Sequence, residues 1–148
     1  MTTSPPRPIG YWLKHLDALI EDHFAQALAA DGVDRRQWQL LNTLAAEPAD
    51  RPHLEMALAP FLIDDPTAAA RALAALIERG WAQDHDGRIT MTPDGAVVHR
   101  RLEGRVTASR ARILDGITAE QYQAVLATLQ LMAANLTGAD HPQWPAGT

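Results

Sequence analysis

The stretch DPTAAARALAALIERGWAQDHDGRITMTPDG, residues 65–95, decides the fold. Asp65 is a good N-cap, and Pro66 fits the first position of a helix, where its missing amide donor costs no hydrogen bond. An alanine-rich run then continues as far as Gly80, which favours a C-terminal stop. These residues predict a helix over 66–79.

A β-hairpin is predicted directly after this helix. Residues 81–84 and 88–91 are two short strand-like runs on either side of a His-Asp-Gly turn at 85–87, and Asp-Gly is a strong hairpin signal. Thr92 can then cap a further helix that has proline at its first position. We expect this long helix to run to about Asp115.

Three helices are predicted upstream of the same stretch. Apolar residues recur at three- and four-residue steps over residues 9–32, which is typical of a long amphipathic helix. Asp34 can cap the second helix, which must end near Glu47 because the proline that follows disfavours helical backbone. The third helix begins around Pro52 and is short, since Pro60 lacks an amide donor and kinks or ends a helix.

A last helix is predicted after Gly116. Thr118 and Gln121 form a capping-box pattern, and the helix continues through Leu136. Two short helices followed by a hairpin form a winged helix-turn-helix, in which the second short helix enters the major groove of DNA. The predicted fold class is therefore mainly α with a small antiparallel β-hairpin, arranged as a winged helix-turn-helix with N- and C-terminal dimerisation helices.

The chain divides into a central lobe and outer helices. We expect residues 33–112 to form the winged helix-turn-helix lobe and its connecting long helix. Residues 9–32 and 113–136 carry apolar stripes that the lobe is too small to cover, so we expect them to be dimerisation helices packed against a second copy. Residues 1–8, which are proline-rich, and 137–148 are expected to be a flexible arm and a tail. The stripes comprise Leu13, Leu16 and Ile20 on the first helix and Leu126, Leu129, Met132, Ala133 and Leu136 on the last.

Composition limits the class of protein. With 148 residues, of which 47% are hydrophobic and 21% charged, the chain can form one domain with a sizeable core. It has no cysteine, which excludes disulfides, thiolate metal sites and cysteine nucleophiles. The N-terminus is polar and proline-rich, and no apolar run reaches about 18 residues. We therefore expect a cytoplasmic protein with no signal peptide and no membrane partner.

The net charge of −5 is unevenly distributed along the chain. Residues 51–112 carry nine basic and eight acidic side chains, whereas residues 113–148 carry three acidic side chains and no basic one. Lys14 is the only lysine, so nearly all the cations are arginines. The planar fork of arginine suits phosphates and base edges, and it equally suits surface ion pairs. Charge therefore permits DNA binding by the central lobe without requiring it.

Five short motifs keep a fixed order and spacing, namely WQLL at 38–41, LAPFL at 58–62, TAAAR at 67–71 leading into LIERGW at 76–81, ITMTPDG at 89–95 and LDGITAE at 114–120. Together they resemble the MarR family of transcriptional regulators over nearly the whole chain. The resemblance implies a homodimer built from the terminal helices, in which two lobes bind a palindromic site on double-stranded DNA. It also implies a repressor, often released by a small phenolic or aromatic effector.

The chain departs from the family in its wing and in its recognition helix. Members usually have a longer wing with an Asp-Arg pair near the tip, whereas the turn here is the short run 84–87 followed by Arg88. The helix that resembles the recognition helix is mostly alanine, and Thr67 and Arg71 are its only polar side chains before Ile77. Alanine methyl groups can contact thymine methyl groups, but one arginine forms few hydrogen bonds to bases. The alternative is a MarR-like helical dimer that binds a small molecule or a protein and has weak or no DNA binding.

Six residues are candidates for DNA contact. Arg71 lies on the expected exposed side of the recognition helix, where it can donate two hydrogen bonds to a guanine edge or pair instead with Asp64 or Asp65. Arg88 can contact a phosphate or the minor groove, or it can balance the acidic residues of the turn. The other candidates are Thr67 and Ala68 on the same helix, and Arg51 and Arg36, whose alternative is a solvated surface position.

Trp12, His15 and Trp38 are candidates for binding an effector. These amphipathic residues fall where the first and second helices are expected to meet, near the site at which the family binds aromatic effectors. They supply the apolar wall and the polar group that a pocket needs. Their alternative is ordinary packing in the core.

Metal sites and enzyme classes lack a supporting motif. His99 and Glu103 lie four residues apart on a predicted helix, but two isolated ligands do not make a tetrahedral site. The sequence contains no GxSxG elbow, phosphate loop, HExxH or glycine-rich dinucleotide motif. We therefore expect a protein that is not an enzyme and that holds no metal and no cofactor.

Overall fold

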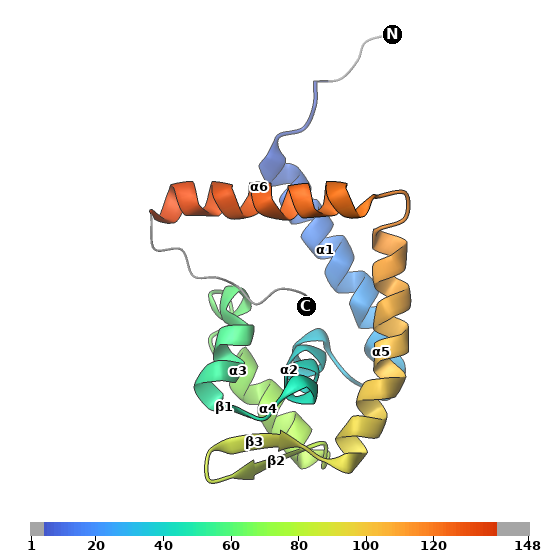
Figure 1. Cartoon of the computed structure of the whole chain (residues 1–148), viewed down its shortest axis with the longest axis vertical. Helices are drawn as coiled ribbons and strands as arrows, with labels where there is room; N and C mark the ends of the chain where they lie inside the picture. Colours follow the sequence, from blue (N-terminus) through green and yellow to red (C-terminus); the bar gives the residue numbers. More distant parts are fainter. Residues whose placement is uncertain (1–4, 139–148) are drawn as a thin grey trace.

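The computed structural model describes residues 5–138, and Figure 1 shows a lower lobe into which the first helix leads directly and from which one long helix continues to the last helix. Residues 1–4 of the predicted arm and 139–148 of the predicted tail lie outside the described residues. In chain order the elements are α1 (Ile9–Leu28), the 3₁₀ turn η1 (Ala29–Asp31), α2 (Arg35–Ala46), β1 (Ala49–Asp50), α3 (Arg51–Ala57), the 3₁₀ turn η2 (Ala59–Leu62), α4 (Ala68–Glu78), β2 (Ala82–His85), β3 (Arg88–Met91), α5 (Pro93–Ile113) and α6 (Ala119–Thr137).

The helix ends are set by caps that the sequence contains. Asp34 accepts a hydrogen bond from the backbone of Gln37 and forms a capping box at the start of α2. Thr118 and Gln121 form the same arrangement at the start of α6. Helix α3 ends at Ala57 and passes into η2, consistent with the proline at the second position of that turn. The helices predicted after Asp34 and after Thr118, and the short third helix, are confirmed.

The start of α4 differs from the prediction. The helix begins at Ala68, two residues after the expected Pro66, because the preceding residues form a separate turn. Asp65 Oδ1 accepts from the backbone N–H of Thr67 at 3.2 Å, and the Asp65 carbonyl accepts from Ala68 N at 3.1 Å. Asp65 therefore stabilises a turn ahead of the helix instead of capping the helix at the next residue.

The wing contains a third strand that the sequence analysis missed. The strands lie in the order β1-β3-β2, and β1 pairs antiparallel with β3 through Ala49 opposite Ile89. The tip of the β2-β3 hairpin is the expected Asp86-Gly87 turn, with φ of +52° and +91°, the left-handed backbone that suits these two residues. Strand β1 is only two residues long, so it shows no alternating pattern; it ties the start of α3 to the wing.

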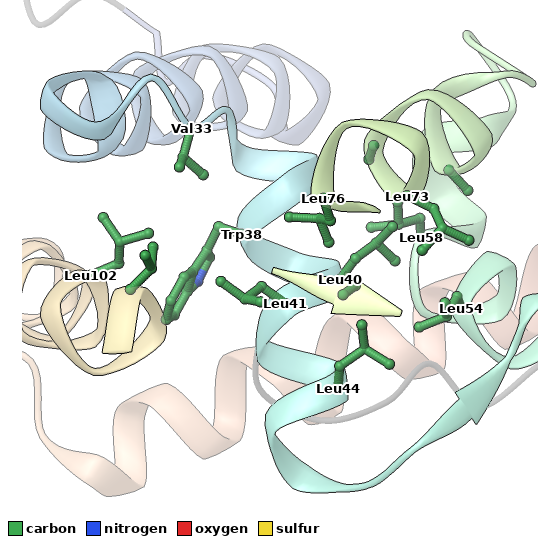
Figure 2. Close-up of a cluster of buried hydrophobic side chains, with 14 of the residues drawn as sticks. Val33, Trp38, Leu40, Leu41, Leu44, Leu54, Leu58, Leu73, Leu76 and Leu102 are labelled. Atoms are coloured by element: carbon green, nitrogen blue, oxygen red, sulfur yellow. The ribbon is translucent and has the colours of Figure 1, made fainter. Parts of the chain in front are cut away.

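Helix α2 forms the centre of the hydrophobic core. Figure 2 shows Trp38, Leu40, Leu41 and Leu44 pointing from it toward the surrounding elements. The apolar side chains packed around them come from α3, α4 and α5 and include Leu54, Leu58, Leu73, Leu76 and Leu102. One continuous core therefore fixes the position of α4 relative to α2 and α5.

The outer helices α1 and α6 leave much apolar surface uncovered. In α1 only Phe24 and Leu28 are buried, and no residue of α6 is buried. In the single chain the exposed large apolar side chains of these helices are Ile9, Tyr11, Trp12, Leu13, Leu16 and Leu19 on α1 and Tyr122, Val125, Leu131, Met132 and Leu136 on α6. Such a contiguous set is characteristic of an interaction surface.

Helix α5 begins in tight contact with the wing. Thr92 Oγ1 accepts from Gly95 N at 3.0 Å and donates to the Gly80 carbonyl at 2.6 Å. A Cβ on Gly95 would lie 2.2 Å from the Trp81 carbonyl oxygen and 2.9 Å from Met91 Cγ. The backbone leaves no room for a side chain here, so glycine is required by close approach.

Gly95→Ala should therefore destabilise the fold by about 1–3 kcal/mol or more, because backbone must move to accept the methyl group. Gly104→Ala is the matched control on the same helix, since a Cβ there meets nothing within 4 Å. That change should stabilise by up to about 1 kcal/mol through helix propensity. Denaturant unfolding of both variants measures the difference; equal effects would contradict the close contact at Gly95.

Candidate nucleic-acid interface

Helix α4 has one buried face and one exposed face. Ala69, Ala72, Leu73 and Leu76 are buried within the core cluster. The opposite face is open to solvent and carries Thr67 just before the helix and Ala70, Arg71, Ala74 and Glu78 within it. The helix is therefore anchored along one side and available for contact along the other.

The alanines divide between these two faces. Ala68, a predicted DNA contact, is only 6% exposed. Ala70 and Ala74 are exposed, so they are the methyl groups that this surface presents. Any contact of alanine methyl groups with thymine therefore falls to Ala70 and Ala74 in place of Ala68.

Arg71 forms the ion pair that the sequence left open. Its guanidinium contacts Asp65, and its side chain is still 66% exposed. The same carboxylate accepts hydrogen bonds from the backbone N–H and the hydroxyl of Thr67, at 3.2 and 3.0 Å. Thr67 and Arg71 are thus brought together at the start of α4 around one aspartate.

A second ion pair connects α3 to the wing. Arg51 Nη2 lies 3.2 Å from Asp84 Oδ2, and Asp84 Oδ1 accepts from the backbone N–H of Gly87 at 2.8 Å. Arg88 is exposed on the neighbouring strand and forms no ion pair within residues 5–138. The turn aspartate therefore pairs with Arg51 and not with Arg88.

Arg36 is mostly buried between α1 and the lobe, and it does not lie on the exposed face of α4 or on the wing. It contacts Glu21 of α1, donates to Gln39 Oε1 at 2.7 Å, and places its guanidinium 3.5 Å from the ring centroid of Phe61. Its side chain is only 21% exposed. These contacts assign it to the joint between α1 and the lobe.

The three predicted effector residues do not form one group. Trp12 and His15 are exposed on α1, with ring centroids 6.2 Å apart. Trp38 is buried in the core and stacks on His99 at 5.0 Å. His99 Nε2 lies 3.0 Å from Asn42 Oδ1, and burial lowers the pKa of His99, which favours its neutral form. Trp38 therefore has the core-packing role that the sequence gave as its alternative.

A small cavity lies where α1, α2, α5 and α6 meet. Its volume is about 150 Å³, and its lining combines aromatic and aliphatic side chains with two arginines: Ile20, Phe24, Arg35, Arg110, Ile113, Leu114 and Tyr122. The sequence analysis predicted an effector site between the first and second helices from Trp12, His15 and Trp38, and none of these three residues lines this cavity. The cavity brings residues of α1 together with residues of α5 and α6 that lie about ninety positions later in the sequence. No local sequence pattern predicts such a contact.

Asp31 is a further structural residue that sequence reasoning missed. Its carboxylate accepts from Arg101 at 2.6 Å and from Arg105 at 2.7 Å, and its carbonyl accepts from Arg79 at 2.7 Å. The hydrogen bond from Arg101 is the main cause that lowers the pKa of Asp31. Through Asp31 the end of α1 is bonded both to α5 and to the C-terminal end of α4.

Within residues 5–138, no group of three or more histidine or acidic side chains is placed to hold a metal ion. No helix in that part of the chain has the length and apolar character needed to cross a membrane.

The lobe and helix α5 match a known domain family. A family model described as the HVO_A0261 N-terminal domain matches residues 27–113, more than half of the chain. No curated protein gave a match.

Several solved structures share the whole architecture. The chain is similar to a MarR family transcriptional regulator from Silicibacter pomeroyi, with 27% identity, coverage of 86% of this chain and 88% of that chain, and a TM-score of 0.66. It is also similar to CouR from Rhodococcus jostii RHA1 bound to p-coumaroyl-CoA, with 20% identity, 90% and 96% coverage and a TM-score of 0.75. A MarR family protein from Mycobacterium tuberculosis in complex with DNA gives 24% identity, 86% and 98% coverage and a TM-score of 0.65. These similarities confirm the winged helix-turn-helix fold that the sequence predicted.

Proposed function

Because the chain belongs to the HVO_A0261 N-terminal domain family and has the MarR-like winged-helix fold, we propose that it is a homodimeric transcriptional regulator that represses by binding a palindromic operator. The observation that carries this proposal is the exposed face of α4, with Thr67, Ala70, Arg71 and Ala74 open to solvent. A helix anchored on one side and free on the other, next to a β-hairpin, is the arrangement that winged helix-turn-helix proteins place in a major groove.

Two classes of contact are proposed for this surface. Arg71 reads a base edge from α4, because its guanidinium can donate two parallel hydrogen bonds to guanine. Arg51 and Arg88 contact backbone phosphates from α3 and the wing, which positions the lobe without reading sequence. Arg36 does not join them, since its guanidinium is already held by Glu21, Gln39 and Phe61.

The experiment that tests the proposal is selection of bound fragments from a random DNA library, followed by titration of the recovered site. Wild-type affinity should fall steeply with salt, because phosphate contacts release counterions. Arg71→Ala should reduce discrimination between the recovered site and scrambled DNA by about 1–3 kcal/mol. Arg112→Ala, in the last turn of α5, is the matched control and should leave discrimination unchanged. A wild-type protein that recovers no site at low salt would favour the alternative, a MarR-like dimer without DNA binding.

Dimerisation through α1 and α6 is the second part of the proposal. The apolar residues along both helices are exposed in the single chain, and a second copy is the simplest partner that covers them symmetrically. Two linked lobes can then bind two half-sites about one helical turn apart.

Leu16→Glu should weaken or abolish the dimer, because it would place a carboxylate within an apolar interface. The matched control is Ile63→Glu, since Ile63 is 80% exposed but lies in the lobe, between η2 and α4. Light scattering at micromolar concentration should give a dimeric mass for the wild type and the control and a lower mass for Leu16→Glu. A wild-type monomer would overturn this part of the proposal.

A small aromatic acid is proposed as the effector, bound in the cavity between α1, α2, α5 and α6. The cavity of about 150 Å³ is smaller than the 300–1,000 Å³ of typical ligand pockets, which limits the ligand to about one ring. Phe24 and Tyr122 provide aromatic walls, and Arg35, whose Nη1 lies 2.7 Å from Glu21 Oε1, provides a cation that the ligand carboxylate would share with Glu21.

Benzoate is a suitable probe for this site, and calorimetric titration should detect its binding. Arg35→Gln should weaken binding about tenfold or more, since it removes a charge-assisted hydrogen bond. Arg101→Gln, which contacts Asp31 and does not line the cavity, is the control. Equal affinities for the two variants would place the acid elsewhere.

A further inference from the structure

We propose that Asp65 and Asp84 set the stringency of DNA binding, because they hold Arg71 and Arg51 in ion pairs that DNA must displace. This inference rests on the proposed function. It concerns the two aspartates that are paired with arginines proposed to contact DNA. It assigns them a role in specificity: they oppose contact with DNA in general and leave the operator favoured.

Asp65 is placed by the turn that precedes α4. Its Oδ1 accepts from Thr67 N and Thr67 Oγ1, and its Oδ2 contacts Arg71. The carboxylate is therefore fixed by the backbone, so Arg71 and not Asp65 is the partner free to turn toward DNA.

At the wing, the two carboxylate oxygens of Asp84 likewise have different partners. Its Oδ1 accepts from Gly87 N at 2.8 Å and so stabilises the hairpin turn, while its Oδ2 lies 3.2 Å from Arg51 Nη2. Two turns that are far apart in the sequence thus use one carboxylate oxygen to fix local backbone and the other to hold an arginine.

The surroundings of Arg71 strengthen the effect. Arg71 lines a surface hollow of about 690 Å³ whose wall carries five carboxylates, from Asp17, Glu21, Asp34, Asp64 and Asp65, against two arginines. Glu21 is paired with Arg35 and Arg36, but the carboxylates around this hollow still outnumber the arginines, so the start of α4 opposes an approaching phosphate backbone.

Specificity follows from the difference between two complexes. On any DNA, Arg71 and Arg51 can exchange a carboxylate for a phosphate, but the released aspartates then face the backbone and repel it. On the operator, the base contacts of Arg71 offset that repulsion, whereas on other sequences nothing does. A repulsive element of this kind lowers the affinity for every duplex, so that random sequences fall below the affinity needed for occupancy while the operator, with its additional base contacts, stays bound.

The test compares Asp65→Asn and Asp84→Asn with matched controls of the same charge change, Asp64→Asn and Asp86→Asn. The amide oxygen of asparagine can still accept from Thr67 N or Gly87 N, so the turns are retained while the ion pairs are lost. Asp64 and Asp86 are exposed neighbours that form no ion pair within residues 5–138. Thermal unfolding verifies that all four variants fold.

Dissociation constants are measured for a random-sequence duplex and for the selected operator. Asp65→Asn and Asp84→Asn should bind the random duplex about two- to fivefold more tightly than their controls, as expected for one exposed ion pair, and should bind the operator more tightly by a similar factor. In an Arg71→Ala background, the difference between Asp65→Asn and Asp64→Asn should disappear. A purely structural role of Asp65 would leave that difference in place.

The outcomes separate this inference from the proposed function. If the wild type binds its operator and each variant matches its control, the inference is overturned and the function stands. If the wild type binds no DNA but Asp65→Asn does, the inference is supported, because the aspartate then blocks binding. If no variant binds DNA at low salt, both are overturned.

Discussion

The packing of α4 against α2 is the constraint on which the rest of the structure depends. Alanines at 69 and 72 let the two helices approach closely, while Leu73 and Leu76 fill the core between α2 and α4. Because that face of α4 is buried in the core, the opposite face is exposed to solvent. The alanines of α4 therefore have two roles. Ala69 and Ala72 pack in the core, whereas the small side chains of Ala70 and Ala74 flank Arg71 on the exposed face.

The position of α4 is also bonded to the outer helices. Arg79 at the end of α4 donates to the carbonyls of Asp31 and Gly32, while Arg101 and Arg105 of α5 hold the Asp31 carboxylate. These bonds join the end of α1, α4 and α5 at one point outside the apolar core. The cavity described above is lined by side chains of α1 and α5, two of the three helices that this joint connects.

Local signals in the sequence predicted most of the fold and only part of the candidate site. The caps at Asp34, Thr92 and Thr118 and the Asp-Gly turn act within about four residues, so they could be read directly. Strand β1 could not, because its two residues become a strand only by pairing with β3. The stacking of Trp38 on His99 and the pairing of Arg51 with Asp84 likewise join positions separated by more than thirty residues. Such contacts are set by the packing of α2 on α5 and of α3 on the wing.

Net charge also says little about this surface, because it does not tell which charged residues lie close together. The value of −5 counts every carboxylate equally, but a carboxylate acts on DNA according to where it is fixed. Those of Asp65 and Asp84 are held by turn backbone next to arginines, whereas Glu120 belongs to the outer helix α6, which lies away from α4 and the wing (Figure 1). An acidic chain can therefore still expose arginines on one surface, with Arg71 and Arg51 each beside a fixed carboxylate. Arg71 and Arg51 are paired with fixed carboxylates in the free protein, and under the proposed function DNA binding has to displace those carboxylates.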